Sequence, residues 1–265
     1  MSAPEPPPVL TLERQAQVLL MGLNRPAKRN AFNIELLLAL GRAYEQLEQD
    51  DELRCGVLFA HGDHFTGGLD LAEVGPALAD GTLAYPPDAR DPWRNDGKPW
   101  TTPVIAAAHG WCMTLGIELL LAADIRVAEP EVRFAQLEIQ RGIYPFGGAT
   151  IRLPREAGWG NAMRWLLTGD EYGADEAHRI GLIQEITEPG AHLDRALELA
   201  QRIATRSAPL GVRATLASAQ RALNEGEAAA AARLTGDMVA LLRTEDGAEG
   251  MMSFIERRPA TFTGR

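Results

Sequence analysis

The stretch PVIAAAHGWCMTLGIELLLAADIRVA, residues 103–128, decides the fold of this chain. It begins with PVIAAAHG and ends with DIRVA, two short apolar runs typical of buried strands, and GIELLLAA between them has the pattern of a buried helix. Strands that alternate with helices along a chain predict an α/β layered fold.

The same alternation continues outward from this stretch. RCGVLFAHG predicts another buried strand, VLTLERQ and AQVLLMGLN predict two more, and NIELLLALGRAYEQLEQD predicts a helix with Asn33 as its N-cap. From about Gly190 the strands stop and Ala-rich amphipathic stretches predict helices. We therefore expect a loose Pro-rich tail over residues 1–8, an α/β core over 9–189 and a helical section over 190–265.

Residues 74–98 are dense in Pro, Gly and Asp, which predicts a long irregular surface segment. With the residues that follow, this part of the chain carries Tyr85, Trp93 and Trp100. These aromatic side chains either cap a bulky ligand or anchor the segment on the protein body.

Composition excludes several classes of partner and compartment. The chain has 265 residues, 46% of them hydrophobic, with a formal net charge of −10 and a pI near 5.1, so it lacks the general basic surface that binds nucleic acid or anionic membranes. Cys55 and Cys112 lie in apolar runs and predict buried free thiols in a reducing compartment. With no signal sequence and no apolar run of membrane-spanning length, we expect a cytoplasmic protein.

Two turns after buried strands are candidates for binding an anion. HGDHFTGGLDL, residues 61–71, is rich in Gly, and a second turn leads into the helix that starts near residues 114–116. Both are also explained as ordinary tight turns, but such turns can leave backbone N–H groups unpaired. Leu69 and Leu115 are the candidate donors of a two-point oxyanion hole.

Two glutamates occupy apolar surroundings near these turns. Glu118 lies in the first turn of GIELLLAAD, where it would also compensate the helix dipole, and Glu138 lies in FAQLEIQRGIYP, where a salt-bridged surface position is the alternative. Together they form a pair that can divide the roles of general acid and general base. His61 and His64 form an H-x-x-H pair without a further ligand at familiar spacing, so no metal site is predicted.

The sequence resembles the crotonase superfamily, the enoyl-CoA hydratase/isomerase family, from about Leu10 to Phe262. The resemblance rests on NRPAKRNAFN (24–33), HFTGGLDL (64–71), residues 103–128, RFAQLEIQRGIYPFGGATIRLPR (133–155), LLTGDEYGADEAHRIGLIQEI and EGMMSFIERRPATF. It implies a spiral of ββα units followed by a helical section that mediates trimerisation, with a homotrimer or a hexamer as the assembly. It also implies an acyl-CoA thioester as substrate, with no metal or redox cofactor.

The resemblance assigns roles to residues of this chain. Leu69 and Leu115 supply the oxyanion-hole N–H groups, and Glu118 and Glu138 match the two glutamates of the family's hydratases. The residues implied in coenzyme A binding are Lys28, Arg29, Ala31, Phe254 and Arg257. For Lys28 and Arg29 the charge of the turn gives an independent reason, since an acidic protein needs local cations to hold polyphosphate.

Several positions depart from the family pattern. Leu115 occupies a position that is usually Gly, and Leu137 one that is usually Pro. Phe146 replaces a Gly and Ile151 a Gln, and Ala72 lies where some hydratases have a coenzyme-binding Lys. We expect an enoyl-CoA hydratase whose substrate carries an acyl group other than the short linear chain that is standard for the family. A double-bond isomerase on the same scaffold and a non-catalytic CoA-binding homologue are the alternatives.

Overall fold

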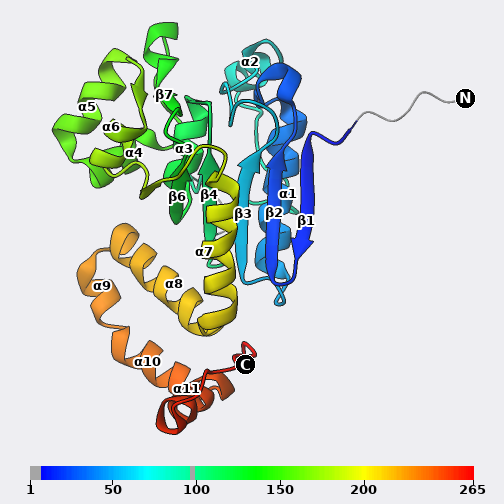
Figure 1. Cartoon of the computed structure of the whole chain (residues 1–265). Helices are drawn as coiled ribbons and strands as arrows, with labels where there is room; N and C mark the ends of the chain where they lie inside the picture. The colour runs from blue at the N-terminus through cyan, green and yellow to red at the C-terminus, as the bar shows by residue number, and fades with distance from the viewer. Residues whose placement is uncertain (1–6, 96–98) are drawn as a thin grey trace, which may run out of the picture.

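The structure of the chain, a computed structural model, describes residues 7–95 and 99–265. Residues 1–6 of the predicted tail and residues 96–98 lie outside the described residues. The expected layered α/β fold is present, with a main sheet between helices and a helical section at one end (Figure 1).

The main sheet has the strand order β1-β2-β3-β4-β6-β9, and all neighbours are parallel except β1 and β2. A smaller sheet has the order β5-β7-β8. The strands of the main sheet are β1 (Leu10–Gln15), β2 (Val18–Leu23), β3 (Cys55–Ala60), β4 (Val104–Ala108), β6 (Ile125–Ala128) and β9 (Glu185–Ile186). Those of the smaller sheet are β5 (Trp111–Met113), β7 (Arg133–Ala135) and β8 (Tyr172–Gly173).

The two faces of the main sheet are buried by helices of different composition. Leu-rich α1 (Ile34–Gln49) and α3 (Leu115–Ala122) pack on one face. Helix α7 (His192–Arg206) covers the other with three fully buried alanines spaced at helical intervals, which lets helix and sheet approach closely: Ala196, Ala200 and Ala204. Although α7 lies beyond residue 190, it completes the core, and only the helices after it project from the body.

Helix α1 begins where the sequence predicts. The side-chain oxygen of Asn33 accepts a hydrogen bond from the N–H of Leu36 at 3.0 Å, which confirms the N-cap. Helix α2 (Leu71–Ala79) was not predicted: it begins before the expected irregular segment and continues into it, and it includes Pro76. The remaining helices are α4 (Ala149–Ala157), α5 (Trp159–Thr168), α6 (Ala174–Arg179), α8 (Pro209–Glu225), α9 (Glu227–Ala231), α10 (Leu234–Leu242) and α11 (Glu245–Glu256), with 3₁₀ turns η1 (Pro26–Lys28) and η2 (Leu137–Arg141).

The chain winds as a spiral because strands of the main sheet turn into short second strands and then into helices. Strand β4 turns into β5 and α3, and β6 turns into β7, η2 and α4. Two isolated parallel bridges, Phe32 with Leu69 and Thr66 with Cys112, extend the same pairing to the turns that follow β2 and β3. The second strands of successive units therefore stack on one another, as the predicted ββα spiral requires.

The segment before β4 is anchored on the protein body. Trp93 and Trp100 are 3% and 1% exposed, and Tyr85 packs against the main core. Trp100 meets the ring of Tyr44 edge-on, with centroids 5.0 Å apart. Of the two readings of these aromatic residues, the structure supports anchoring.

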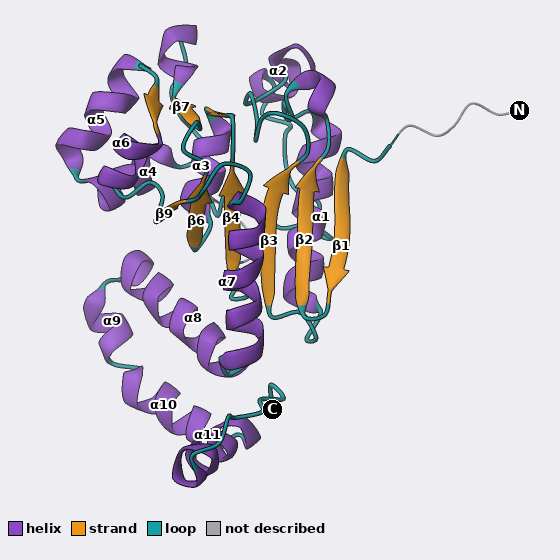
Figure 2. Ribbon diagram, in the orientation of Figure 1, coloured by secondary structure: helices purple, strands orange, loops and turns teal. Residues whose placement is uncertain are grey.

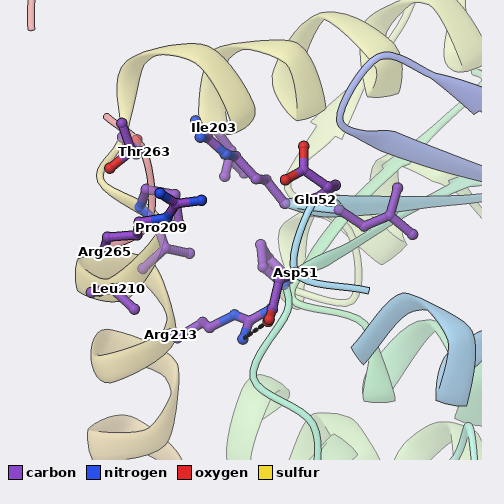
Figure 3. Close-up of a pocket in the computed structure, with 14 residues that line it drawn as sticks. Asp51, Glu52, Ile203, Pro209, Leu210, Arg213, Thr263 and Arg265 are labelled. Carbon is purple, nitrogen blue, oxygen red and sulfur yellow. Dashed lines mark ion pairs between the residues drawn. The ribbon is translucent and has the colours of Figure 1, made fainter. Parts of the chain in front are cut away.

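The helices after α7 extend away from the sheet (Figure 2). A cavity of about 330 Å³ lies between the start of α8 and the body and is lined by residues that include Asp51, Arg213 and Thr263 (Figure 3). Arg54 lines it too and donates to the carbonyls of Ala204 at 2.9 Å and Phe262 at 2.8 Å, which fastens the end of the described chain to the body. This cavity lies at the amino ends of the strands, away from the turns that the sequence marks as anion sites.

Candidate active site

The two predicted turns lie side by side at the carboxyl ends of β3 and β4. The N–H of Thr66 donates to the carbonyl of Trp111 at 2.9 Å, and the N–H of Met113 donates to the carbonyl of Thr66 at 3.0 Å. These bonds form because Thr66 bridges Cys112 in parallel register. Segments that are some 45 residues apart by number in the chain thus form one backbone surface.

The N–H group of Leu69 takes no part in the parallel bridge between Leu69 and Phe32. Phe32 donates to the carbonyl of Gly68 at 2.8 Å and accepts from the N–H of Asp70 at 2.9 Å. In a parallel bridge the residue between these two groups points its own N–H away from the partner strand. Among the described residues no group accepts a hydrogen bond from Leu69 N–H.

Among the described residues the N–H group of Leu115 has no acceptor, because it belongs to the first residue of α3. Thr114 before it has φ 51° and ψ −116°, an unusual conformation for a β-branched residue, and this sets the direction of the Leu115 N–H. Gly68 has φ +100°, and a Cβ there would lie 2.0 Å from Thr114 Oγ1, so only glycine fits. The residues that precede the two donors are therefore in contact.

Leu115 itself, which stands for the family's Gly, lies in the helix and is not among the residues with positive φ. The unusual backbone conformation belongs to Thr114 instead. Sequence reasoning missed Thr114, and the signal available was a β-branched residue at the junction of a strand, a turn and a helix.

Glu118 is 1% exposed and is held by the turn before α4. Its Oε1 accepts from the N–H of Ala149 at 3.0 Å, and a Cβ on Gly147 would lie 2.5 Å from its Oε2. Burial raises the pKa of Glu118 to about 8, while the N–H of Ala149 acts to lower that pKa and the charge of Glu138 raises it further. This carboxyl therefore titrates near neutral pH.

Glu138 lies in η2 and is 7% exposed. Burial raises the pKa of its carboxyl to about 7. With its amide nitrogen turned toward Glu138, Gln136 donates to the two carboxylate oxygens at 2.9 and 3.1 Å and to the carbonyl of Thr114 at 3.2 Å. Gln136, which the sequence did not single out, connects the second carboxylate to the turn that carries the Leu115 donor.

Arg152 places a positive charge near Glu118. Its guanidinium donates to the carbonyls of Gly147 at 3.3 Å and Arg94 at 3.0 Å, and the charge acts to lower the pKa of Glu118. It thus ties the turn that holds Glu118 to the segment before β4.

The candidate coenzyme A residues fall into two separate groups. Lys28 and Arg29 are exposed, and the carbonyl of Arg29 accepts from the N–H of Gly67 at 2.8 Å, so this turn and the neighbouring Ala31 border the turn of Leu69. Phe254 and Arg257 lie at the end of α11, which is at the opposite end of the molecule from α2 in Figure 1. Within one chain the structure does not bring these two groups together.

The histidines of the H-x-x-H pair have other partners. His61 Nε2 lies 2.8 Å from Thr11 Oγ1, and the His64 ring stacks on Trp111 and accepts from its backbone N–H at 3.2 Å. The described residues contain no group of three or more His, Cys, Asp or Glu side chains arranged to hold a metal ion.

The family model described as enoyl-CoA hydratase/isomerase matches residues 13–265 of this chain. The chain belongs to the enoyl-CoA hydratase/isomerase family. This confirms the resemblance found in the sequence, and it accounts for the order in which the turns and the two glutamates occur.

Relatives and solved structures agree with this placement over nearly the whole chain. The chain is 34% identical to the enoyl-CoA hydratase EchA19 of Mycobacterium tuberculosis, covering 100% of each, and 33% identical to the 2,3-dehydroadipyl-CoA hydratase of Escherichia coli, covering 97% and 99%. A crystal structure of a probable enoyl-CoA hydratase/isomerase from Mycobacterium abscessus superposes with a TM-score of 0.94 at 50% identity, covering 97% and 99%. The crotonase fold of this family member is thereby confirmed. No described helix is long and apolar enough to cross a membrane.

The raised pKa of Glu138 predicts how stability depends on pH. In the unfolded chain the pKa of this carboxyl is about 4.5, so between that pH and about 7 the folded state binds the extra proton. The resulting stabilisation is complete below the unfolded pKa and is lost as pH rises through the folded pKa. Glu138→Gln cannot titrate, so its melting temperature relative to the parent should rise from pH 5 to pH 8, by about 2–4 °C for each kcal/mol.

Thermal unfolding at the two pH values measures this difference. Glu131→Gln, at an exposed position, is the matched control and should show a constant difference. A constant difference for Glu138→Gln as well would contradict the burial of a titrating carboxyl.

Proposed function

We propose that this family member is an enoyl-CoA hydratase, which adds water across the C2–C3 double bond of an enoyl-CoA thioester. One observation carries the proposal. Two buried carboxyls with raised pKa values occur together with two backbone N–H groups that lack acceptors among the described residues. Glu118 lies on the helix that begins at Leu115, and Gln136 connects Glu138 to the turn before that helix. Such groups suit a reaction that forms an enolate and moves protons near neutral pH.

In this mechanism the thioester oxygen binds between the N–H groups of Leu69 and Leu115. Negative charge develops on that oxygen as water attacks C3, and donors aimed at it stabilise the enolate more than the bound substrate. Removal of one such donor costs about 3 kcal/mol of transition-state stabilisation. Because both donors are backbone groups, the leucine side chains do not remove them.

The two glutamates handle the protons. Glu118 positions and helps deprotonate the water, and Glu138 delivers a proton to C2. Because burial and mutual repulsion oppose two negative charges, the carboxyls titrate as a coupled pair that retains a proton near neutral pH, and they share these duties. This chemistry calls for neither a metal nor a redox cofactor.

An isomerase uses the same residues, with one glutamate that shuttles a proton and the other auxiliary. The names of the hydratases from Mycobacterium tuberculosis and Escherichia coli favour hydration. A non-catalytic CoA-binding protein would explain the departures at Leu115 and Phe146, but both carboxyls are kept in buried positions whose desolvation costs free energy.

A panel of enoyl-CoA esters followed by liquid chromatography and mass spectrometry separates the three functions, because chromatography resolves double-bond isomers of equal mass. We expect products heavier by one water molecule. Products of unchanged mass with a shifted double bond would establish an isomerase, and binding without any product would establish a non-catalytic homologue.

We further propose that the substrate carries an apolar acyl group larger than a short linear chain. The turn after Glu138 exposes several large apolar side chains, which would be unfavourable in water unless a ligand or a second chain covers them. They are Ile139, Ile143, Tyr144 and Phe146. The two buried free thiols, Cys55 and Cys112, support our proposal of a cytoplasmic location.

Glu118→Gln and Glu138→Gln should each reduce the rate of hydration by at least about a hundredfold, since each removes a positioned acid or base. Binding of the CoA thioester should survive, which calorimetry with a saturated acyl-CoA measures. Glu131→Gln again serves as a matched exposed control. Near-normal turnover in both variants would exclude a paired-carboxylate mechanism.

Lys28 and Arg29 are proposed to hold the phosphates of coenzyme A. Replacing both with Ala should raise KM for the thioester and largely preserve kcat, because contacts remote from the reacting carbons act about equally in ground and transition states. Added salt should reduce this increase in KM, because salt screens interactions between exposed charges, with a Debye length of about 10 Å at 0.1 M ionic strength.

The control for this pair changes the net charge equally at a distant place. Arg202 and Arg206 are exposed on α7, and their double Ala variant should leave KM unchanged. Equal KM values for the two double variants at low salt would remove the phosphate assignment.

A homotrimer or a dimer of trimers is proposed as the assembly. The helices α10 and α11 carry exposed apolar side chains that include Leu234, Met238, Leu242, Met251 and Phe254. A second copy that covers this face would bury them, and it would also allow Phe254 and Arg257 to reach the coenzyme of a neighbouring chain.

Light scattering at micromolar concentration should give three or six times the chain mass of 28.7 kDa. Leu242→Glu, which places a charge on the apolar face, should shift the mass downward, whereas Glu225→Gln at the exposed end of α8 should not. A monomeric parent protein would contradict the assembly.

A further inference from the structure

Trp93 makes a contact that the two-glutamate mechanism leaves unexplained. Its indole N–H donates to the carbonyl of Leu115 at 3.0 Å, although Trp93 belongs to the irregular segment before β4 and Leu115 begins α3. The side chain is 3% exposed. A buried indole N–H usually has an acceptor, and here the acceptor belongs to the residue whose own N–H is a candidate oxyanion donor.

The ring of Trp93 also reaches the other donor segment. It meets Phe32 edge-on, with centroids 5.4 Å apart and an interplanar angle of 76°. Phe32 is fully buried, and its backbone pairs with Gly68 and Asp70 on either side of Leu69. One side chain therefore contacts both the residue that carries one N–H and the residue that holds the other in place.

The turn that presents Trp93 is itself fixed. Asp91 accepts from the N–H of Trp93 at 2.9 Å and from the N–H of Asn95 at 2.7 Å. Arg152, from the helix after the turn that holds Glu118, donates to the carbonyl of Arg94 at 3.0 Å. The segment between α2 and β4 thus holds the indole against the segments that carry the Leu69 and Leu115 N–H groups.

We propose that Trp93 is a positioning residue that sets the separation and direction of the Leu69 and Leu115 N–H groups. The proposal rests on the hydratase function and adds to it a residue that touches no substrate. Thr114 holds the Leu115 peptide in an unfavourable conformation, which persists only where the surroundings enforce it. The hydrogen bond from Trp93 supplies part of that enforcement, so its loss lets the Leu115 N–H turn away from the enolate oxygen.

Trp100 provides a matched control. It is 1% exposed, meets Tyr44 edge-on, and lies in the same part of the chain, but its indole N–H has no acceptor among the described residues. Trp93→Phe and Trp100→Phe therefore remove the same atoms from equally buried sites. Only Trp93→Phe removes a hydrogen bond to the carbonyl of Leu115.

The experiment compares kcat, KM and the absorption of a bound chromophore. Trp93→Phe should lower kcat for hydration about tenfold, short of the 10²–10³ lost when a donor itself is removed, with KM within about twofold of the parent. Trp100→Phe should keep kcat within about twofold. A conjugated aryl-enoyl-CoA should absorb at longer wavelength when bound, because hydrogen bonds to its carbonyl stabilise charge separation, and this shift should shrink in Trp93→Phe alone.

A second variant isolates the hydrogen bond from changes in packing. Benzothienylalanine at position 93 replaces the indole N–H with sulfur and keeps the size of the ring system, so it should reproduce the lower kcat and the smaller absorption shift with an unchanged melting temperature. Parent-like kcat and absorption in this variant would overturn the proposal. A parent protein that neither hydrates the panel of esters nor shifts the chromophore would instead overturn the hydratase function.

Discussion

The pairing of backbone groups between successive turns of the spiral is the constraint on which the rest of this structure depends. Buried N–H and C=O groups must be paired, and the bridges from Phe32 to Leu69 and from Thr66 to Cys112 meet that requirement across segments far apart in sequence. Where the ladder stops and a helix starts, two N–H groups lack partners in the described structure. The two unpaired N–H groups thus follow from where the fold ends the backbone pairing between successive turns.

The carboxylates illustrate a second constraint, since desolvation opposes the charges that the chemistry uses. Glu118 and Glu138 are buried, and burial raises the pKa of each toward neutrality. Backbone N–H groups of the turn at Gly147 and Ala149, together with the nearby Arg152, offset part of that effect at Glu118. The balance leaves groups that can both give and take a proton near pH 7.

The helical section has two roles that the fold separates. Helix α7 belongs to the core, because its small buried residues seat it against the sheet, while the helices after it expose apolar side chains. Phe254 and Arg257 lie far from the turn at Lys28 within one chain.

The sequence by itself determined the features that depend on neighbours along the chain. The buried strands, the start of α1 at Asn33 and the positions of Glu118 and Glu138 follow from apolar periodicity and from hydrogen bonds within one turn, and the family resemblance fixed the fold. Tertiary packing determined the conformation of Thr114, the donation from Gln136 to the carbonyl of Thr114 and the contact of Trp93 with Leu115. These arise from packing between segments distant in sequence, and no local preference of threonine, glutamine or tryptophan encodes which distant group each will meet.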